Sequence, residues 1–308
     1  MSDRRLWTRV RTHIGDAVRW TTDAEIGLSE GLIAGLSFVG PILFAAALGN
    51  LPLGLIASAG SLPIGRVGPG RSLFDQGRSL ALSVLPTIVA AAIAEFLVGG
   101  GLAGRLLTIV CAGVAALLGG YDRTAAIVTT RFTLFLIIAQ SMSAATPHPA
   151  AMMALLTAGA LWTALLWLLF GAVVRSTTSR TPILAEQGPA AAAPAKLARW
   201  RASLGRPAGW HFTLKLVSCL VAAEALDQTF PNHHLQWIAL TVVILAQRRT
   251  NLFPIKVTQR ALGAGAGVLL AGLCLAAHPS AWTLTGCIGL IAGTRPLLKS
   301  RHYVPIPR

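Results

Sequence analysis

Long apolar runs alternate with short polar segments along most of the chain. Many of these runs approach the roughly 20 residues that cross about 30 Å of hydrocarbon at about 1.5 Å per residue. The pattern predicts an all-α, polytopic integral membrane protein with about ten transmembrane helices. The predicted spans are residues 30–50, 51–64, 79–98, 102–119, 124–142, 151–174, 212–230, 235–247, 260–277 and 281–294.

Two of the runs, 51–64 and 235–247, are short, and an internal repeat accounts for both. In each half of the chain, a full-length span leads to a short run, then to a basic loop containing a proline, and then to a long span. Arg78 and Arg260 occupy equivalent positions, at the start of the third helix of each half. Repeat-built transporters bind their substrates at the repeat interface, and paired short segments are the best sequence pointer to that site.

Residues 175–211 depart from the apolar pattern because they are basic and rich in Pro, Ala and Gly. We expect a cytoplasmic linker with a short surface helix around residues 196–204. The linker divides the chain into a first membrane block of six spans, residues 1–174, and a second block of four spans, residues 212–308.

Composition supports the membrane assignment. Of the 308 residues, 54% are hydrophobic and 12% are charged, whereas soluble domains carry about 25% charged residues. The net charge of +15 could indicate nucleic-acid binding, but the cations lie between apolar runs. With a cytoplasmic N-terminus, every Lys and Arg except Arg105, Arg131 and Lys215 falls in or beside a cytoplasmic segment. We therefore expect a multi-pass inner-membrane protein that contacts lipid and does not bind nucleic acid.

The sequence offers no catalytic or metal-binding motif in the structural context that such a motif requires. The four cysteines lie within apolar runs and form no CxxC pair, so neither a disulfide framework nor a metal site is predicted. No P-loop, HExxH motif or nucleophile elbow in a strand–turn–helix context is present in the sequence. We expect no enzymatic activity and no cofactor, and any transport must be secondary or depend on a partner.

One stretch carries a family resemblance. Residues 235–273, LQWIALTVVILAQRRTNLFPIKVTQRALGAGAGVLLAGL, resemble the conserved region of the fusaric acid resistance (FUSC) family, also called aromatic acid exporters. In that family a Trp opens an apolar strip, a basic loop follows, and R-x-x-G-T-x-x-G begins the next helix. Trp237, Arg260, Gly263 and Gly267 match this pattern, and Ala264 stands where the family often has Thr.

The resemblance implies an inner-membrane exporter of aromatic carboxylic acids or related toxic organic compounds, driven by the proton gradient. The partners it implies are a small organic-acid substrate, a periplasmic adaptor protein and further copies of the chain. Because the family usually has six spans in its second block, we expect the region here to be incomplete at its C-terminus. The alternative is a truncated, non-transporting membrane scaffold or partner subunit.

Cations near the membrane surface are the first candidates for substrate binding. Arg78 and Arg260 either anchor the chain to lipid headgroups or form a basic vestibule that gathers anionic substrates. Arg131 either snorkels to the cytoplasmic face or binds a carboxylate. Gly263 and Gly267 favour close helix packing or leave a gap for a planar ligand. The hypothesised substrate-binding residues are Arg78, Arg131, Arg260, Gly263, Gly267 and Trp237.

Three carboxylates within predicted spans are candidates for proton coupling. Glu95, Glu224 and Asp227 lie toward the predicted periplasmic side. Glu224 and Asp227 share a helix face because they are three residues apart. A carboxylate in a bilayer usually faces a cavity or a partner, which favours a role in proton transfer. The alternative is that these residues lie at helix ends wetted by lipid headgroups.

Overall fold

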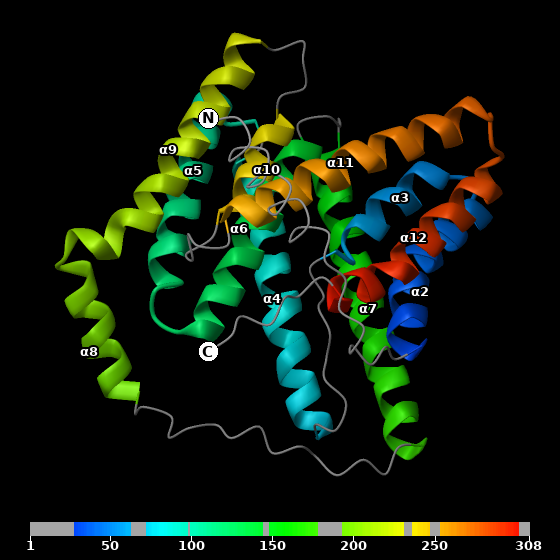
Figure 1. The fold of residues 1–308 in the computed structure, drawn as a ribbon, viewed down its shortest axis with the longest axis horizontal. Coiled ribbons are helices and arrows are strands. Elements are labelled where there is room, and N and C mark those ends of the chain that lie inside the picture. Colours follow the sequence, from blue (N-terminus) through cyan, green and yellow to red (C-terminus); the bar gives the residue numbers. More distant parts are fainter. Residues whose placement is uncertain are drawn as a thin grey trace, which may run out of the picture.

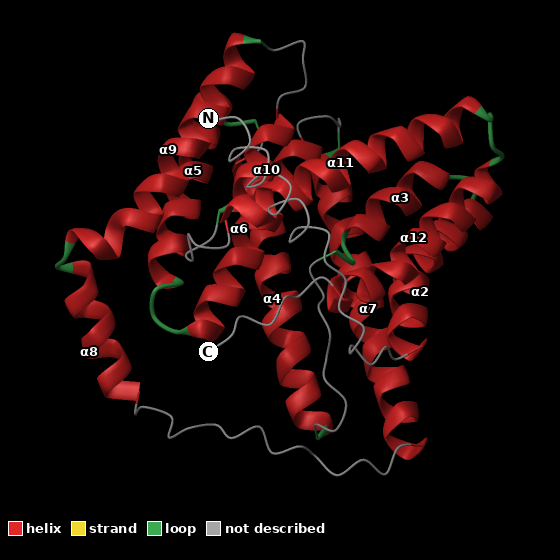
Figure 2. Cartoon of the chain, viewed as in Figure 1, coloured by secondary structure: helices red, strands yellow, loops and turns green. Residues whose placement is uncertain are grey.

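The computed structural model describes residues 28–62, 72–97, 99–143, 148–177, 193–230, 236–246 and 253–301. Within these residues the fold is entirely helical and contains no strand (Figure 2). This result confirms the predicted all-α class. The helices, labelled in Figure 1, are α2 (Leu28–Ala47), α3 (Leu51–Ala59), α4 (Leu73–Leu97), α5 (Gly101–Leu118), α6 (Arg123–Ser143), α7 (Pro149–Thr177), α8 (Ala193–Leu204), α9 (Pro207–Thr229), α10 (Gln236–Leu245), α11 (Phe253–Ala276) and α12 (Ala281–Arg301).

Several helices are long and apolar enough to cross a membrane. Among the described residues, five qualify by length and composition: Glu30–Ala47, Phe74–Leu97, Gly101–Leu118, Arg123–Met142 and Pro149–Phe170. Large apolar side chains lie on the outside of the bundle, where Phe44 is 71% exposed and Phe96 is 87% exposed. Such an exterior suits lipid rather than water. The chain is a multi-pass helical membrane protein.

A helix lies at each of the ten predicted spans, but the count of ten membrane crossings stays a prediction. The helices α3 and α10, at the two short runs, have 9 and 10 residues. At about 1.5 Å per residue each covers roughly half of the hydrocarbon thickness. Neither helix can cross the bilayer unaided.

The helices α2 and α12 pack closely through identical glycine motifs. Both carry the pentapeptide GLIAG, at residues 31–35 and 289–293. A Cβ atom added to Gly31 would lie 3.1 Å from the carbonyl oxygen of Gly293, and one added to Gly35 would lie 3.4 Å from that of Gly289. Small residues four apart let helix backbones approach each other. A helix of the predicted second block is thereby joined to the first helix of the predicted first block.

Two apolar clusters organise the rest of the bundle, and α6 contributes to both. The first joins α4, α6 and α7 around Phe135 and Leu156, which are fully buried. The second joins α5, α6, α9 and α10, with Ile137 and Leu216 among its buried members. The helices α9 and α10 therefore pack directly against α5 and α6. Figure 1 shows this group on the side of the molecule away from α2 and α12.

The linker helix α8 lies against the turn between α5 and α6. The indole Nε1 of Trp200 donates a hydrogen bond of 3.1 Å to the carbonyl oxygen of Leu117. The same indole meets the ring of Tyr121 edge-on, with 6.3 Å between the ring centroids. Lys196 forms an ion pair with Asp122 at 3.8 Å. These contacts hold the expected surface helix at the end of the bundle where α5 finishes.

Candidate functional site

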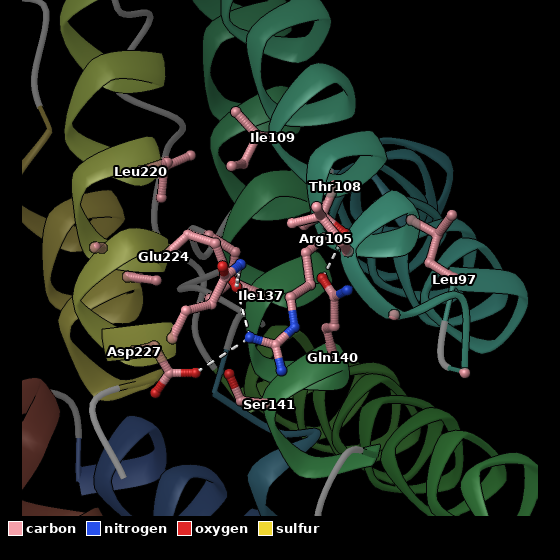
Figure 3. A pocket seen from close by; sticks show the side chains of 16 residues that line it. Leu97, Arg105, Thr108, Ile109, Ile137, Gln140, Ser141, Leu220, Glu224 and Asp227 are labelled. Carbon is pink, nitrogen blue, oxygen red and sulfur yellow. Dashed lines mark hydrogen bonds and ion pairs between the residues drawn. The ribbon is translucent and has the colours of Figure 1, made fainter. Parts of the chain in front are cut away.

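Among the ion pairs of the described residues, two share one arginine, and they join α5 to α9. Nη1 of Arg105, in the second turn of α5, lies 2.6 Å from Oε1 of Glu224 and 3.5 Å from Oδ2 of Asp227. The two carboxylates point to the same guanidinium because a spacing of three residues places them on one face of α9 (Figure 3). The side chains of Arg105, Glu224 and Asp227 are 42%, 24% and 20% exposed, so the cluster is partly open to solvent.

This charged cluster lies in the wall of a cavity of about 780 Å³, which is within the usual size range of small-molecule sites. The cavity is bordered by α5, α6, α9 and α10, with the end of α4 at its edge. Its charged residues, among those that the structure places there, are Arg105, Glu224 and Asp227. The other lining residues are Leu97, Gly99, Gly101, Leu102, Thr108, Ile109, Ile137, Gln140, Ser141, Leu220, Ala223, Gln228 and Ala239.

Neutral polar groups connect the same helices around the cavity. Oγ1 of Thr108 on α5 donates a hydrogen bond to Oε1 of Gln140 on α6. Nε2 of Gln228 donates to Oε1 of Glu224 at 3.2 Å, one turn along α9. Among the described contacts the amide nitrogen of Gln140 has no protein acceptor, so it can donate a hydrogen bond to a ligand. The cavity thus combines a charged wall, an amide donor and aliphatic surface.

Two glycines between the end of α4 and the start of α5 line the cavity. Gly99 and Gly101 adopt φ angles of +90° and +54°. These angles fall in the left-handed region, where residues with a Cβ atom are strained. Both glycines line the cavity, and Arg105 follows one helical turn after Gly101. The glycine turn between α4 and α5 therefore fixes where α5 begins, and with it the position of Arg105 relative to α9.

The predicted proton-coupling residues are only partly brought together. Glu224 and Asp227 face the cavity and share Arg105. Glu95 lies on α4 near its C-terminal end, where it is exposed and outside the cavity lining. The proton-coupling role of these three residues stays a prediction.

The predicted vestibule arginines lie apart from the charged cluster. Arg78 is exposed in the second turn of α4, and Arg260 is exposed on α11. Neither lines the 780 Å³ cavity. Trp237, in the first turn of α10, is 61% exposed. Gly263 and Gly267 on α11 have no atom within 4 Å of an added Cβ atom in the described part of the chain.

Arg131 of α6 lies against a break in the hydrogen bonding of α4. Pro86 lies inside α4 and has no N–H to donate to the carbonyl oxygen of Leu82. Nη1 of Arg131 donates to that oxygen at 3.5 Å and also to the hydroxyl of Ser83. Arg131 thus supplies the hydrogen bond that a backbone N–H would otherwise donate to Leu82. This helix-packing role differs from both alternatives that the sequence left open, which were snorkelling and carboxylate binding.

A second cavity, of about 410 Å³, lies between α2, α3 and α7. Its wall is apolar and includes Phe44, Leu48 and Trp162. The indole Nε1 of Trp162 donates to the carbonyl oxygen of Leu36 at 3.2 Å. The two short helices therefore each border a cavity: α10 borders the charged one and α3 borders the apolar one.

Sequence reasoning missed Arg105, Thr108 and Gln140 as site residues. Arg105 carried a signal, because it was one of three cations outside the expected cytoplasmic segments. An isolated cation in an apolar span needs a partner, and Glu224 and Asp227 were available. Thr108 and Gln140 had no distinguishing signal, because single polar residues are common in helical spans.

Comparison with known proteins supports the family resemblance. Residues 218–306 match the family described as fusaric acid resistance protein-like. This match confirms the predicted resemblance and covers α10, α11, α12 and the C-terminal half of α9. It includes both Glu224 and Asp227, whereas Arg105 lies outside it. No curated protein and no solved structure matches the chain significantly.

Proposed function

We propose that the chain is an inner-membrane secondary transporter that exports aromatic carboxylic acids or related toxic organic compounds in exchange for protons. The observation that carries this proposal is the Arg105–Glu224–Asp227 cluster in the wall of the 780 Å³ cavity. An arginine can hold an organic carboxylate, and carboxylates beside it can accept protons. The match of residues 218–306 to the fusaric acid resistance protein-like family supports the substrate class.

The cavity suits an amphipathic acid. Arg105 offers a charged contact for the carboxylate, and the amide of Gln140 offers a neutral donor. The aliphatic side chains of Ile109, Ile137 and Leu220 offer surface for a ring. With a cytoplasmic N-terminus, this cavity lies toward the periplasmic ends of its helices, on the release side of the proposed exporter.

Arg78 and Arg260 are proposed to gather substrate on the cytoplasmic side. Both residues are exposed, and they occupy equivalent positions of the predicted repeat. Cations at a membrane surface raise the local concentration of anionic solutes. Arg131, which already contacts α4, would then support the helix arrangement between the vestibule and the cavity.

Efflux from membrane vesicles tests the proposed function. Vesicles that contain the protein are loaded with radiolabelled 4-hydroxybenzoate and diluted into a more acidic buffer, so that the proton gradient points inward, and its release is followed with and without a protonophore. We expect release above that of protein-free vesicles, and we expect the protonophore to abolish the excess. Equal release with and without the protonophore would reject proton coupling.

The same experiment distinguishes a transporter from a non-transporting membrane protein. A non-transporting scaffold or partner subunit would give the release of protein-free vesicles under every condition. Substitution of Arg105 by Gln supplies an internal control, because it removes the proposed carboxylate contact and leaves the exterior of the bundle unchanged.

A further inference from the structure

We propose that the solute crosses the protein along the centre of a ring formed by α5, α6, α9 and α10, and that an apolar plug in the middle of this ring closes the path. The plug consists of the side chains of Ile109, Ile137, Leu216, Leu220 and Val243. This inference rests on the proposed function and assigns its route and its barrier.

The four helices form a closed ring. α5 packs against α6 and α9, and α10 packs against the same two helices. Within the described residues, the backbones of α5 and α10 do not approach each other closely, and neither do those of α6 and α9. The predicted first block supplies α5 and α6, and the predicted second block supplies α9 and α10. The centre of the ring therefore lies between the two blocks, where repeat-built transporters bind their substrates.

A hollow lies at each end of the ring. The 780 Å³ cavity lies at one end, and a recess of about 20 Å³ lies between the same four helices. On α9, Glu224 lines the cavity and Phe212 lines the recess; near α10, Ala239 lines the cavity and Ala246 lines the recess. The two hollows therefore lie at opposite ends of the ring. The residues that line the recess are Ala116, Thr129, Thr130, Thr133, Phe212, Leu216, Val243 and Ala246.

The plug separates the two hollows. Ile109, Ile137 and Leu220 form the floor of the cavity (Figure 3), whereas Leu216 and Val243 border the recess. All five side chains belong to one apolar cluster and are between 3% and 8% exposed. Transfer of a polar group into such surroundings is costly without a hydrogen-bond partner. The plug is thus a barrier to a charged or polar solute.

The recess is polar, unlike the plug. The hydroxyls of Thr129, Thr130 and Thr133 donate to backbone carbonyl oxygens of α6 at 2.8, 2.7 and 2.9 Å. Each hydroxyl oxygen keeps the ability to accept a hydrogen bond. A hollow of about 20 Å³ is large enough for about one water molecule. The centre of the ring therefore changes from a charged cavity to an apolar plug and then to a hydroxyl-lined recess.

The short helix α10 keeps the barrier thin. Ala239 lies on α10, and Ala246 lies just beyond its C-terminal end, with Val243 between them. At about 1.5 Å per residue, the segment from Ala239 to Ala246 covers about 10 Å, which is about a third of the hydrocarbon thickness. A barrier of this length opens through a small helix shift. This proposal gives the short span of the second block a function.

Cysteine labelling along α10 tests the path. Ala239→Cys, Val243→Cys and Ala246→Cys are each made in a background whose four natural cysteines are replaced by alanine. A small membrane-impermeant thiol reagent is added to right-side-out or inside-out vesicles. We expect labelling of Ala239→Cys from the face that carries the Arg105 cavity and of Ala246→Cys from the opposite face. Val243→Cys should react at least about tenfold more slowly than either, because buried thiols are inert.

A matched pair of leucine variants tests the plug. Leu220→Ala shortens a plug residue, and Leu156→Ala removes the same atoms from the apolar cluster around Phe135. Both should unfold at a lower temperature, because a cavity in a packed core is destabilising. Leu220→Ala alone should release 4-hydroxybenzoate in the presence of a protonophore, since a weakened plug lets the solute leak down its own gradient. Leu156→Ala should leak no faster than wild type.

Three results would overturn the inference. They are labelling of Ala239→Cys and Ala246→Cys from the same face, labelling of Val243→Cys as fast as both, and equal leak from Leu220→Ala and Leu156→Ala. Failure of the proposed function is distinguishable. It appears as absent gradient-driven efflux from wild-type vesicles, whereas the labelling pattern requires no transport. Wild-type efflux combined with a contrary labelling pattern would reject the path alone.

Discussion

Nη1 of Arg105 lies 2.6 Å from Oε1 of Glu224, although the two residues are 119 positions apart in the sequence. The contact joins α5, in the predicted first membrane block, to α9, in the predicted second block. Each residue is an ionisable group in an otherwise apolar stretch of sequence. Such groups persist in membrane helices when they meet a partner or a cavity, and this pair has both.

Substitution of Arg105 should separate the role of its charge from the role of its shape. Arg105→Gln should reduce 4-hydroxybenzoate efflux by at least about tenfold, because one charge-assisted contact is lost. Arg105→Lys should retain part of the activity. Arg199→Gln, which removes an exposed cation from α8, is the matched control and should transport normally. Wild-type efflux from Arg105→Gln would remove Arg105 from the substrate pathway.

Arg260 provides a test of the proposed vestibule. Its side chain is exposed on α11, so Arg260→Gln should leave the melting temperature unchanged. If the vestibule gathers anions, this variant should raise the KM for 4-hydroxybenzoate and affect the maximal rate less. The difference from wild type should shrink at high salt, because salt screens the attraction between exposed charges. Unchanged transport at low salt would assign Arg260 to lipid anchoring.

The glycine contact between α2 and α12 predicts a position-dependent effect on stability. Gly35→Leu places a side chain against the backbone of Gly289 and Gly293. Overpacking of this kind costs about 1–3 kcal/mol, so thermal unfolding in detergent should begin at a lower temperature. Gly286→Leu, at a position on α12 with no atom within 4 Å of an added Cβ atom among the described residues, should change the unfolding temperature much less. Equal effects at both positions would contradict the packing account.

Arg131 and Pro86 should be coupled energetically. Arg131→Met removes the donor to the carbonyl oxygen of Leu82, and a lost hydrogen bond to a charged group costs about 1.5–3 kcal/mol. Pro86→Ala restores the backbone N–H that would otherwise serve that oxygen. Arg131→Met should therefore lower the free energy of unfolding less in the Pro86→Ala background than in wild type. A double-mutant cycle measures this difference, and additive effects would show that Arg131 does not replace the missing donor.

The helical architecture was predictable because hydrophobic run length and the positive-inside bias are local signals. Most helix positions followed from them, and so did the short surface helix in the linker. The number of membrane crossings was harder to predict from the sequence, because α3 and α10 have only 9 and 10 residues. Whether such short helices cross the bilayer depends on the helices packed around them. The sequence of a short segment alone therefore does not decide whether that segment crosses the hydrocarbon layer.

The candidate site was predictable only in part, because it depends on contacts between distant helices. Glu224 and Asp227 stood out as carboxylates within a span, but their partner Arg105 could not be chosen over Arg131 from sequence alone. The role of Arg131 required the position of α6 relative to Pro86. The glycine contact between α2 and α12 likewise depends on a pairing between the two ends of the described chain.

Transport driven by a pH gradient, compared with substrate exchange, tests the central claim most directly. Proteoliposomes containing wild type or Glu224→Gln/Asp227→Asn are given radiolabelled 4-hydroxybenzoate, either with an imposed proton gradient or with unlabelled substrate on the opposite side. We predict that the double variant keeps substrate exchange and loses gradient-driven accumulation, because it lacks the two carboxylates that are proposed to carry the proton. Gradient-driven accumulation at the wild-type level in that variant would contradict the account.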